Sequence, residues 1–257
     1  MLVLLSCAKT MSETSKVRVP LTTVPRFQKE AAGIALQMSQ FPVDELERLL
    51  RVNAKIAVEN YKRYQAFHAE HAPELPALLA YTGIVFKRLN PKDFSAGDFE
   101  YAQQHLRLTS FCYGLLRPLD VIRAYRLEGD VVLPELGNRN LFAYWRSRLT
   151  DVFIEDIKRA GGILCNLASD EMKGLFDWKR VEKEVRVVTP EFRVWKNGKP
   201  ATIVIYTKMS RGEMTRFILK NRIEDPEDLK GFSWEGFECD EALSNENQFV
   251  FINGKGG

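Results

Sequence analysis

The sequence lacks several motifs that mark common enzyme and membrane-protein classes. Its 257 residues contain no Cys-x-x-Cys pair, no Gly-x-Gly-x-x-Gly or Walker loop, and no apolar run of 18 residues. These absences argue against the usual zinc and dithiol sites, the common nucleotide-binding loops and a membrane-spanning helix. The apolar stretch at residues 1–5 is too short for a signal peptide. We therefore expect a soluble cytoplasmic protein with no membrane partner.

Cysteine and histidine are scarce and scattered. Two of the three histidines, His68 and His71, share a helical face, but Pro73 indicates that the helix ends there, and no third ligand is evident. The four cysteines lie in mostly apolar stretches, at positions 7, 112, 165 and 239. We predict buried free thiols in a reducing compartment, no metal site and no cofactor.

The remaining composition is that of a folded domain with a substantial core. Hydrophobic residues make up 45% of the chain and aromatic residues 11%. Asn53, Ser95 and Asn140 are suitable residues to begin helices. Helices are expected over 26–38, 43–51, 53–67, 98–113, 140–159 and 211–222, and strands over 2–5, 75–81, 124–127, 131–133, 163–166, 184–188, 192–195, 202–206 and 249–252. Buried strands that alternate with helices predict one α/β domain over residues 1–257, with a mixed β-sheet flanked by helices.

Charge is nearly balanced overall but segregated along the chain. The formal net charge is only +3. Residues 208–222 carry five basic side chains and one acid, whereas residues 224–246 carry nine acids and one lysine. Such segregation favours a positive surface on a protein that stays near neutral. The two runs could equally pair with each other or lie apart in solvent.

A basic segment at residues 105–126 is typical of a phosphate clamp. The pattern predicts a helix that stops at Gly114, a turn, and a second helix that starts at Pro118. Helix-start amides and arginine side chains both direct donors at anionic oxygen. The cations are at positions 107, 117, 123 and 126, opposed by Asp120. An ordinary helix end followed by proline explains the same positions of Gly114 and Pro118 without any ligand.

Polar residues follow two of the predicted buried strands. Ser6 and Lys9 come after one strand, and Asn166 and Asp170 come after another. Open α/β sheets place ligand groups at the carboxyl ends of their strands, so these residues are expected to share a crevice if the strands are neighbours. A lysine and a carboxylate there suit acid–base chemistry or a structural ion pair.

Several ordered motifs carry a family resemblance. They are Leu5-Ser6-x-Ala8-Lys9-Thr10, Gln103-x-x-Leu106-Arg107, Tyr113-Gly114-x-Leu116-Arg117-Pro118-Leu119-Asp120, Tyr125-Arg126-Leu127-Glu128, Asn166-Leu167-Ala168-Ser169-Asp170-Glu171, and Arg211-Gly212-x-Met214-x-Arg216-Phe217 with Asn221-Arg222. In order and spacing they resemble the bacterial YaaA family of peroxide-stress proteins, essentially from end to end. One departure is Cys7, where relatives usually carry proline.

The resemblance implies a fold described as cantaloupe-like, a helix-hairpin-helix element over about residues 98–124, and a positively charged cleft. It also implies DNA binding with little sequence preference and a role in limiting iron-dependent oxidative damage. We expect no obligate protein partner. The expected DNA-binding residues are Lys9, Arg107, Gly114, Arg117, Arg123, Arg126, Lys208, Arg211 and Arg216, with Ser6, Asp120, Asn166 and Asp170 as further polar residues of the cleft.

An enzyme is the alternative interpretation, acting on a phosphorylated small molecule or a nucleic-acid end. Its mixed-charge cleft would contain Lys9, Asp120, Arg126, Asp170 and Arg211.

Overall fold

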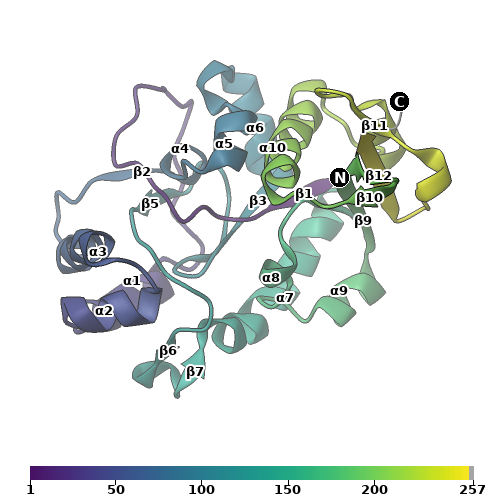
Figure 1. Ribbon diagram of the computed structural model, residues 1–257. Coiled ribbons are helices and arrows are strands. Elements are labelled where there is room, and N and C mark those ends of the chain that lie inside the picture. Colours follow the sequence, from purple (N-terminus) through teal and green to yellow (C-terminus); the bar gives the residue numbers. More distant parts are fainter. Residues whose placement is uncertain (255–257) are drawn as a thin grey trace.

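A mixed, mostly parallel sheet runs through the computed structural model, which describes residues 1–254 (Figure 1). Its strand order is β11-β12-β9-β8-β1-β3-β4, with β10 paired to β9. These strands are β1 (Leu2–Leu5), β3 (Leu106–Ser110), β4 (Gly114–Leu116), β8 (Ile163–Asn166), β9 (Arg186–Lys196), β10 (Lys199–Ala201), β11 (Phe237–Cys239) and β12 (Gln248–Asn253). Two small ribbons pair β2 (Glu74–Pro76) with β5 (Val121–Arg123) and β6 (Val132–Leu133) with β7 (Arg139–Asn140). The predicted single α/β domain is confirmed.

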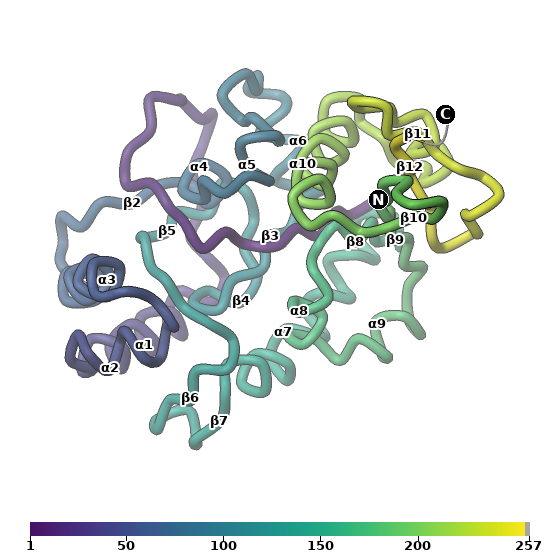
Figure 2. Tube along the Cα trace, viewed as in Figure 1, coloured from purple at the N-terminus to yellow at the C-terminus, as the bar shows by residue number. Residues whose placement is uncertain are grey.

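Helices cover both faces of the sheet (Figure 1). They are α1 (Gln28–Met38), α2 (Val43–Leu50), α3 (Ala54–Ala66), α4 (Ala77–Ala80), α5 (Ile84–Leu89), α6 (Ala96–His105), α7 (Leu141–Arg159), α8 (Asp170–Lys173), α9 (Trp178–Glu184) and α10 (Val204–Asn221). Helices α5, α6 and α10 lie on one side of the central strands, and α7 and α9 lie on the other. Helices α1, α2 and α3 pack together beyond the β4 edge (Figure 2).

The central strands are apolar because both of their faces are covered. Strand β1 pairs in parallel with β3 on one side and with β8 on the other, so Val3 stands level with Leu106 and Cys165. Residues Leu2–Leu5 are at most 1% exposed. Continuous apolar runs are typical of strands buried in a parallel sheet. As a result, the carboxyl ends of β1, β3 and β8 meet at one edge, where ligand groups are usually placed.

Side-chain caps fix the starts of three helices where the sequence predicts them. The Asn53 side chain accepts a hydrogen bond from the Ile56 amide, and Asn140 accepts one from the Ala143 amide. Ser95 and Asp98 form a reciprocal capping box at the start of α6. These bonds satisfy amides that a helix start otherwise leaves without partners.

The predicted pair of helices over about residues 98–124 is wrong. Helix α6 ends at His105, and the chain continues as the antiparallel hairpin of β3 and β4 before it reaches β5. Pairing of Leu106–Leu108 with β1 outweighs the helical propensity of this apolar run. Gly114 still makes the turn with φ of +70°, but a Cβ there would lie 2.8 Å from the Trp145 ring. Its backbone therefore packs against the core.

Four shorter predictions also differ from the structure. The expected strand at 75–81 is β2 followed by α4, and the stretch 124–127 belongs to no strand. Residues 202–206 lead into α10, which begins seven positions before the predicted helix. The two strands expected between 184 and 195 are one strand, β9.

Asp98 provides a pH-dependent link between α6 and α10. Its carboxylate accepts hydrogen bonds from Lys220 and Arg222, each at 2.8 Å, as well as from the Ser95 amide. Burial raises the pKa of Asp98, but Lys220, Ser95 and Arg222 outweigh it and hold the pKa well below its usual value. A depressed pKa in the folded state stabilises the fold above the unfolded pKa of about 4, and the gain disappears as pH falls further.

We expect Asp98→Asn to lower the free energy of unfolding at pH 7 by about 1–3 kcal/mol, because charged hydrogen bonds are lost. The deficit relative to the unaltered chain should shrink as pH falls from 5 to 2, since protonation removes the same charge. Urea titrations at several pH values measure both effects. A deficit that does not change with pH would contradict the assignment.

Candidate nucleic-acid interface

The carboxyl ends of β1 and β8 form the crevice that the sequence predicts. The segment that leaves β1 meets the start of α8, where the Ser169 amide donates to Ser6 Oγ at 2.8 Å. The two hydroxyl oxygens of these serines are 3.3 Å apart. In the same loop, Asn166 is buried and accepts a hydrogen bond from the Ala168 amide at 3.2 Å. Ser6 and Asn166 thus shape the loops around the crevice.

A cavity of about 320 Å³ opens at this edge, and we call it the carboxyl-edge cavity. Its walls come from the β1 end, α5, residues 125–127, α8 and α10. Four of the predicted DNA-binding cations line it, namely Lys9, Arg126, Lys208 and Arg211. The structure therefore brings together residues that lie as far apart in sequence as positions 9 and 211.

Arg211 is the cation in this cavity best suited to an external anion. It is half-buried on α10, and within residues 1–254 its guanidinium has no hydrogen bond or ion pair. Burial lowers the pKa of Arg211, and the more distant charges of Asp170 and Glu191 partly oppose this shift. A partly desolvated guanidinium without a carboxylate partner retains its full set of donors for phosphate.

Gly212 permits the position of Arg211 in the crevice. A Cβ at Gly212 would lie 2.3 Å from the backbone oxygen of Val85, so α10 approaches α5 closely only because this residue has no side chain. Val85 itself lines the carboxyl-edge cavity. The spacing of the two helices thus sets one wall of the cavity.

Glu128 organises two other cations of the cavity. Its carboxylate is 2.7 Å from Lys9 Nζ and 3.5 Å from the Arg126 guanidinium. Arg126 Nε remains buried with no hydrogen-bond partner in the part of the chain that the structure describes. The expected pairing of Lys9 with Asp170 is not formed, because Asp170 is exposed and binds Lys173 at 2.8 Å.

A second, wider cavity of about 1000 Å³ adjoins the first, and we call it the cationic groove. The loop after β1 crosses the molecule to reach it (Figure 2) and is held there by a 2.7 Å hydrogen bond from the Ser12 amide to the Ala80 carbonyl. Its cations are Lys16, Arg18, Lys87 and Lys92. Within residues 1–254 these four side chains make no hydrogen bond or ion pair, and no acid is among the groove's lining residues.

The groove and the carboxyl-edge cavity share the wall formed by Phe86. Together they collect eight of the 37 lysines and arginines and one of the 34 acids, Glu171. Sequence reasoning missed the four groove cations because they lie in two segments about 70 positions apart. The sequence feature that could have identified them is the pair Lys16 and Arg18 in a Ser/Thr-rich loop without an adjacent helix.

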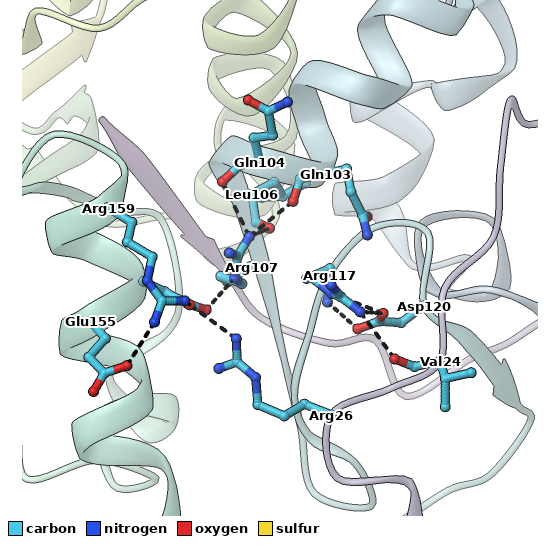
Figure 3. A network of polar contacts seen from close by, with 11 residues as sticks. Val24, Arg26, Gln103, Gln104, Leu106, Arg107, Arg117, Asp120, Glu155 and Arg159 are labelled. Carbon is cyan, nitrogen blue, oxygen red and sulfur yellow. Dashed lines mark hydrogen bonds and ion pairs between the residues drawn. The ribbon is translucent and has the colours of Figure 1, made fainter.

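Two predicted DNA-binding arginines are instead held within the fold (Figure 3). Arg107 is 7% exposed, donates from Nε to Asp156 at 2.7 Å, and donates from its guanidinium to nearby backbone carbonyls. Arg117 binds Asp120 through Nε at 3.1 Å and through a terminal nitrogen at 2.8 Å. Neither arginine lines either cavity. Each is bound to an acid, Asp156 or Asp120, that lines neither cavity.

The remaining predicted cations also have internal partners. Arg123 is close to Glu74, donates to the Phe67 carbonyl, and borders a separate cavity beside α3. Arg216 binds Asp93 at 2.6 Å. The structure therefore does not bring Arg107, Gly114, Arg117, Arg123 or Arg216 into the shared surface.

Within residues 1–254 the structure contains neither a membrane-spanning helix nor a metal-binding cluster. No helix within residues 1–254 is both long enough and apolar enough to cross a membrane. Over the same range, no group of three or more His, Cys, Asp or Glu side chains is arranged to hold a metal ion. In addition, burial raises the pKa of the Cys7 thiol in the cavity wall to about 12, which disfavours the reactive thiolate.

Comparison with known proteins gives consistent matches along the chain. The family model described as peroxide stress protein YaaA matches residues 1–243. A UPF0246 protein of Bacteroides thetaiotaomicron is 87% identical over 256 residues and is covered completely, as is this chain. UPF0246 proteins of Phocaeicola vulgatus and Crocosphaera subtropica are 62% and 38% identical, each over 98% of this chain and 98% and 100% of their own lengths.

Proposed function

Because the chain belongs to the peroxide stress protein YaaA family, we propose that it acts in the response to peroxide by binding DNA with little sequence preference. The observation that carries the proposal is the collection of eight cations around the cationic groove and the carboxyl-edge cavity, six of which have no acid partner within residues 1–254, while Lys9 and Arg126 are paired with Glu128. The proposed DNA-binding set is Lys9, Lys16, Arg18, Lys87, Lys92, Arg126, Lys208 and Arg211. Limiting iron-dependent damage would be a consequence of this binding.

The mechanism is electrostatic. Lysines and arginines that neutralise DNA phosphates release condensed counterions, and this release supplies most of the non-specific affinity. Phosphate contacts position the nucleic acid but do not read its bases. The groove cations Lys16, Arg18, Lys87 and Lys92 are exposed and have no internal partners, so binding breaks no ion pair of the fold.

A salt titration tests the proposal. For the unaltered protein we expect the logarithm of the association constant to fall linearly with the logarithm of salt concentration. The slope should be between about −4 and −7, since four to eight phosphates each contribute about 0.9. Two duplexes of unrelated sequence should give the same slope and similar affinities, measured by fluorescence anisotropy. Binding that is insensitive to salt, or confined to one sequence, would overturn the proposal.

One observation supports the enzymatic alternative. Lys9, Arg126 and Arg211, which it requires, do line one cavity. Its two carboxylates are elsewhere, because Asp120 binds Arg117 and Asp170 points to Lys173 at the surface. Turnover of a 5′-phosphorylated oligonucleotide that is lost in Arg211→Met would establish this alternative.

A further inference from the structure

The carboxyl-edge cavity has walls of a different chemistry from its mouth. Six large side chains in the wall are each at most 5% exposed, namely Phe86, Phe111, Tyr125, Leu127, Leu167 and Met172. The less buried part of the lining, which we call the mouth, includes Arg211 and Lys208, which have no internal partners within residues 1–254, and the acid Glu171. A ligand that matches both the apolar wall and the cationic mouth has a flat apolar body and a phosphate. A free inorganic anion satisfies only the mouth.

The cavity is also of a definite size. A volume of about 320 Å³ is near the lower end of the range of about 300–1,000 Å³ for small-molecule sites. This volume is suited to a single nucleotide, whereas a longer stretch of strand requires the open groove of about 1000 Å³. The two spaces are adjacent, because Phe86 borders both. A strand bound in the groove would lie next to the cavity, with Phe86 between the two spaces.

We propose that the carboxyl-edge cavity takes one unpaired nucleotide of the bound DNA, with its base against the apolar wall and its phosphate on Arg211 and Lys208. This inference rests on the proposed DNA binding and specifies the form of DNA that the same site prefers. Stacking on aromatic and apolar groups is tolerant of sequence, because every base has a π-face. The buried Nε of Arg126, which has no partner among the described residues, is a further donor in the cavity wall.

The preference for unpaired DNA follows from the energetics of extrusion. A paired base must be unstacked and unpaired before it can enter a pocket, whereas a bulged or mismatched base has already lost part of that free energy. Base stacking on protein side chains strengthens binding by about 5- to 150-fold per base. DNA that carries one unpaired nucleotide should therefore bind more tightly than the same duplex when fully paired.

Three DNA ligands of identical flanking sequence test the inference. One is fully paired, one carries a single bulged thymidine, and one carries an abasic residue at the bulge. We expect the thymidine bulge to bind at least about fivefold more tightly than the paired duplex. The abasic bulge is equally flexible but has no base, so it should show little of this gain. Equal affinities for the two bulged ligands would overturn the inference.

Three variants separate this inference from the proposal on which it rests. Arg211→Met should remove the gain for the thymidine bulge, and Arg211→Lys should restore part of it. Neutralising Lys16, Arg18, Lys87 and Lys92 should weaken binding of all three ligands alike and preserve their ratio. Salt-dependent binding without a gain for the bulge would contradict only the inference, whereas salt-independent binding would contradict the DNA-binding proposal itself. Circular dichroism confirms that each variant is folded.

Discussion

Replacing Lys16, Arg18, Lys87 and Lys92 together by glutamine is expected to weaken DNA binding by about 100- to 1,000-fold at 0.15 M salt. Each cation that contacts a phosphate contributes about 0.9 to the salt slope, so the slope should become shallower by about 3.6. The four side chains have no hydrogen bond or ion pair in the described fold, so the unfolding free energy should change little. Anisotropy titrations between 0.05 and about 0.3 M salt measure both changes.

A second quadruple variant provides the matched control. Lys29, Lys179, Lys183 and Lys199 are exposed and line neither cavity, so their replacement removes the same charge from other surfaces. We expect this control to retain most of the affinity and nearly the full salt slope. If the two variants weaken binding equally, general charge rather than the cationic groove accounts for it.

Asp156→Ala is expected to lower the free energy of unfolding by about 3–5 kcal/mol, because it leaves a buried charge without its partner. Asp156 is 3% exposed and accepts from Arg107 at 2.7 Å and from Arg26 at 3.1 Å. Burial raises the pKa of Asp156, but these two arginines outweigh it and hold the pKa below its usual value. Urea denaturation at pH 7 measures the loss.

The double variant Asp156→Ala with Arg107→Met tests whether the unpaired charge of Arg107 causes this loss of stability. Removing both charges leaves no uncompensated ion, so the double variant should be more stable than Asp156→Ala alone. Its DNA-binding salt slope should match that of the unaltered protein, because Arg107 lines neither cavity. A shallower slope would indicate that Arg107 contacts DNA, as the sequence pattern predicts.

The parts of the fold that sequence could predict are those governed by local chemistry. Strand β1 is a short apolar run buried on both faces, and Asn53, Ser95 and Asn140 cap helices through bonds within three residues. The failure at 106–110 has the opposite origin. That apolar run is compatible with either a helix or a strand, and pairing with β1, about 100 positions away, decides between them.

The same difference between local patterns and long-range contacts applies to the candidate site. Ser6 and Lys9 could be placed because ligand groups follow the carboxyl ends of parallel strands. The burial of Arg107 could not be predicted because a list of cations does not show their partners, and Asp156 lies 49 positions further on. Lys16 and Lys87 were missed because the path of their loop depends on the bridge between Met11 and Tyr81. The order of residues in the sequence does not show which cations the fold pairs with an acid.

Lysine footprinting tests the central claim most directly. The protein is acetylated with and without a saturating duplex, and the modification of each lysine is measured by mass spectrometry. We predict that DNA protects Lys16, Lys87, Lys92 and Lys208, while Lys29, Lys179, Lys183 and Lys199 react as in the free protein. Equal reactivity of the first four lysines with and without DNA would contradict the assignment of the cationic groove and the carboxyl-edge cavity as the DNA-binding surface.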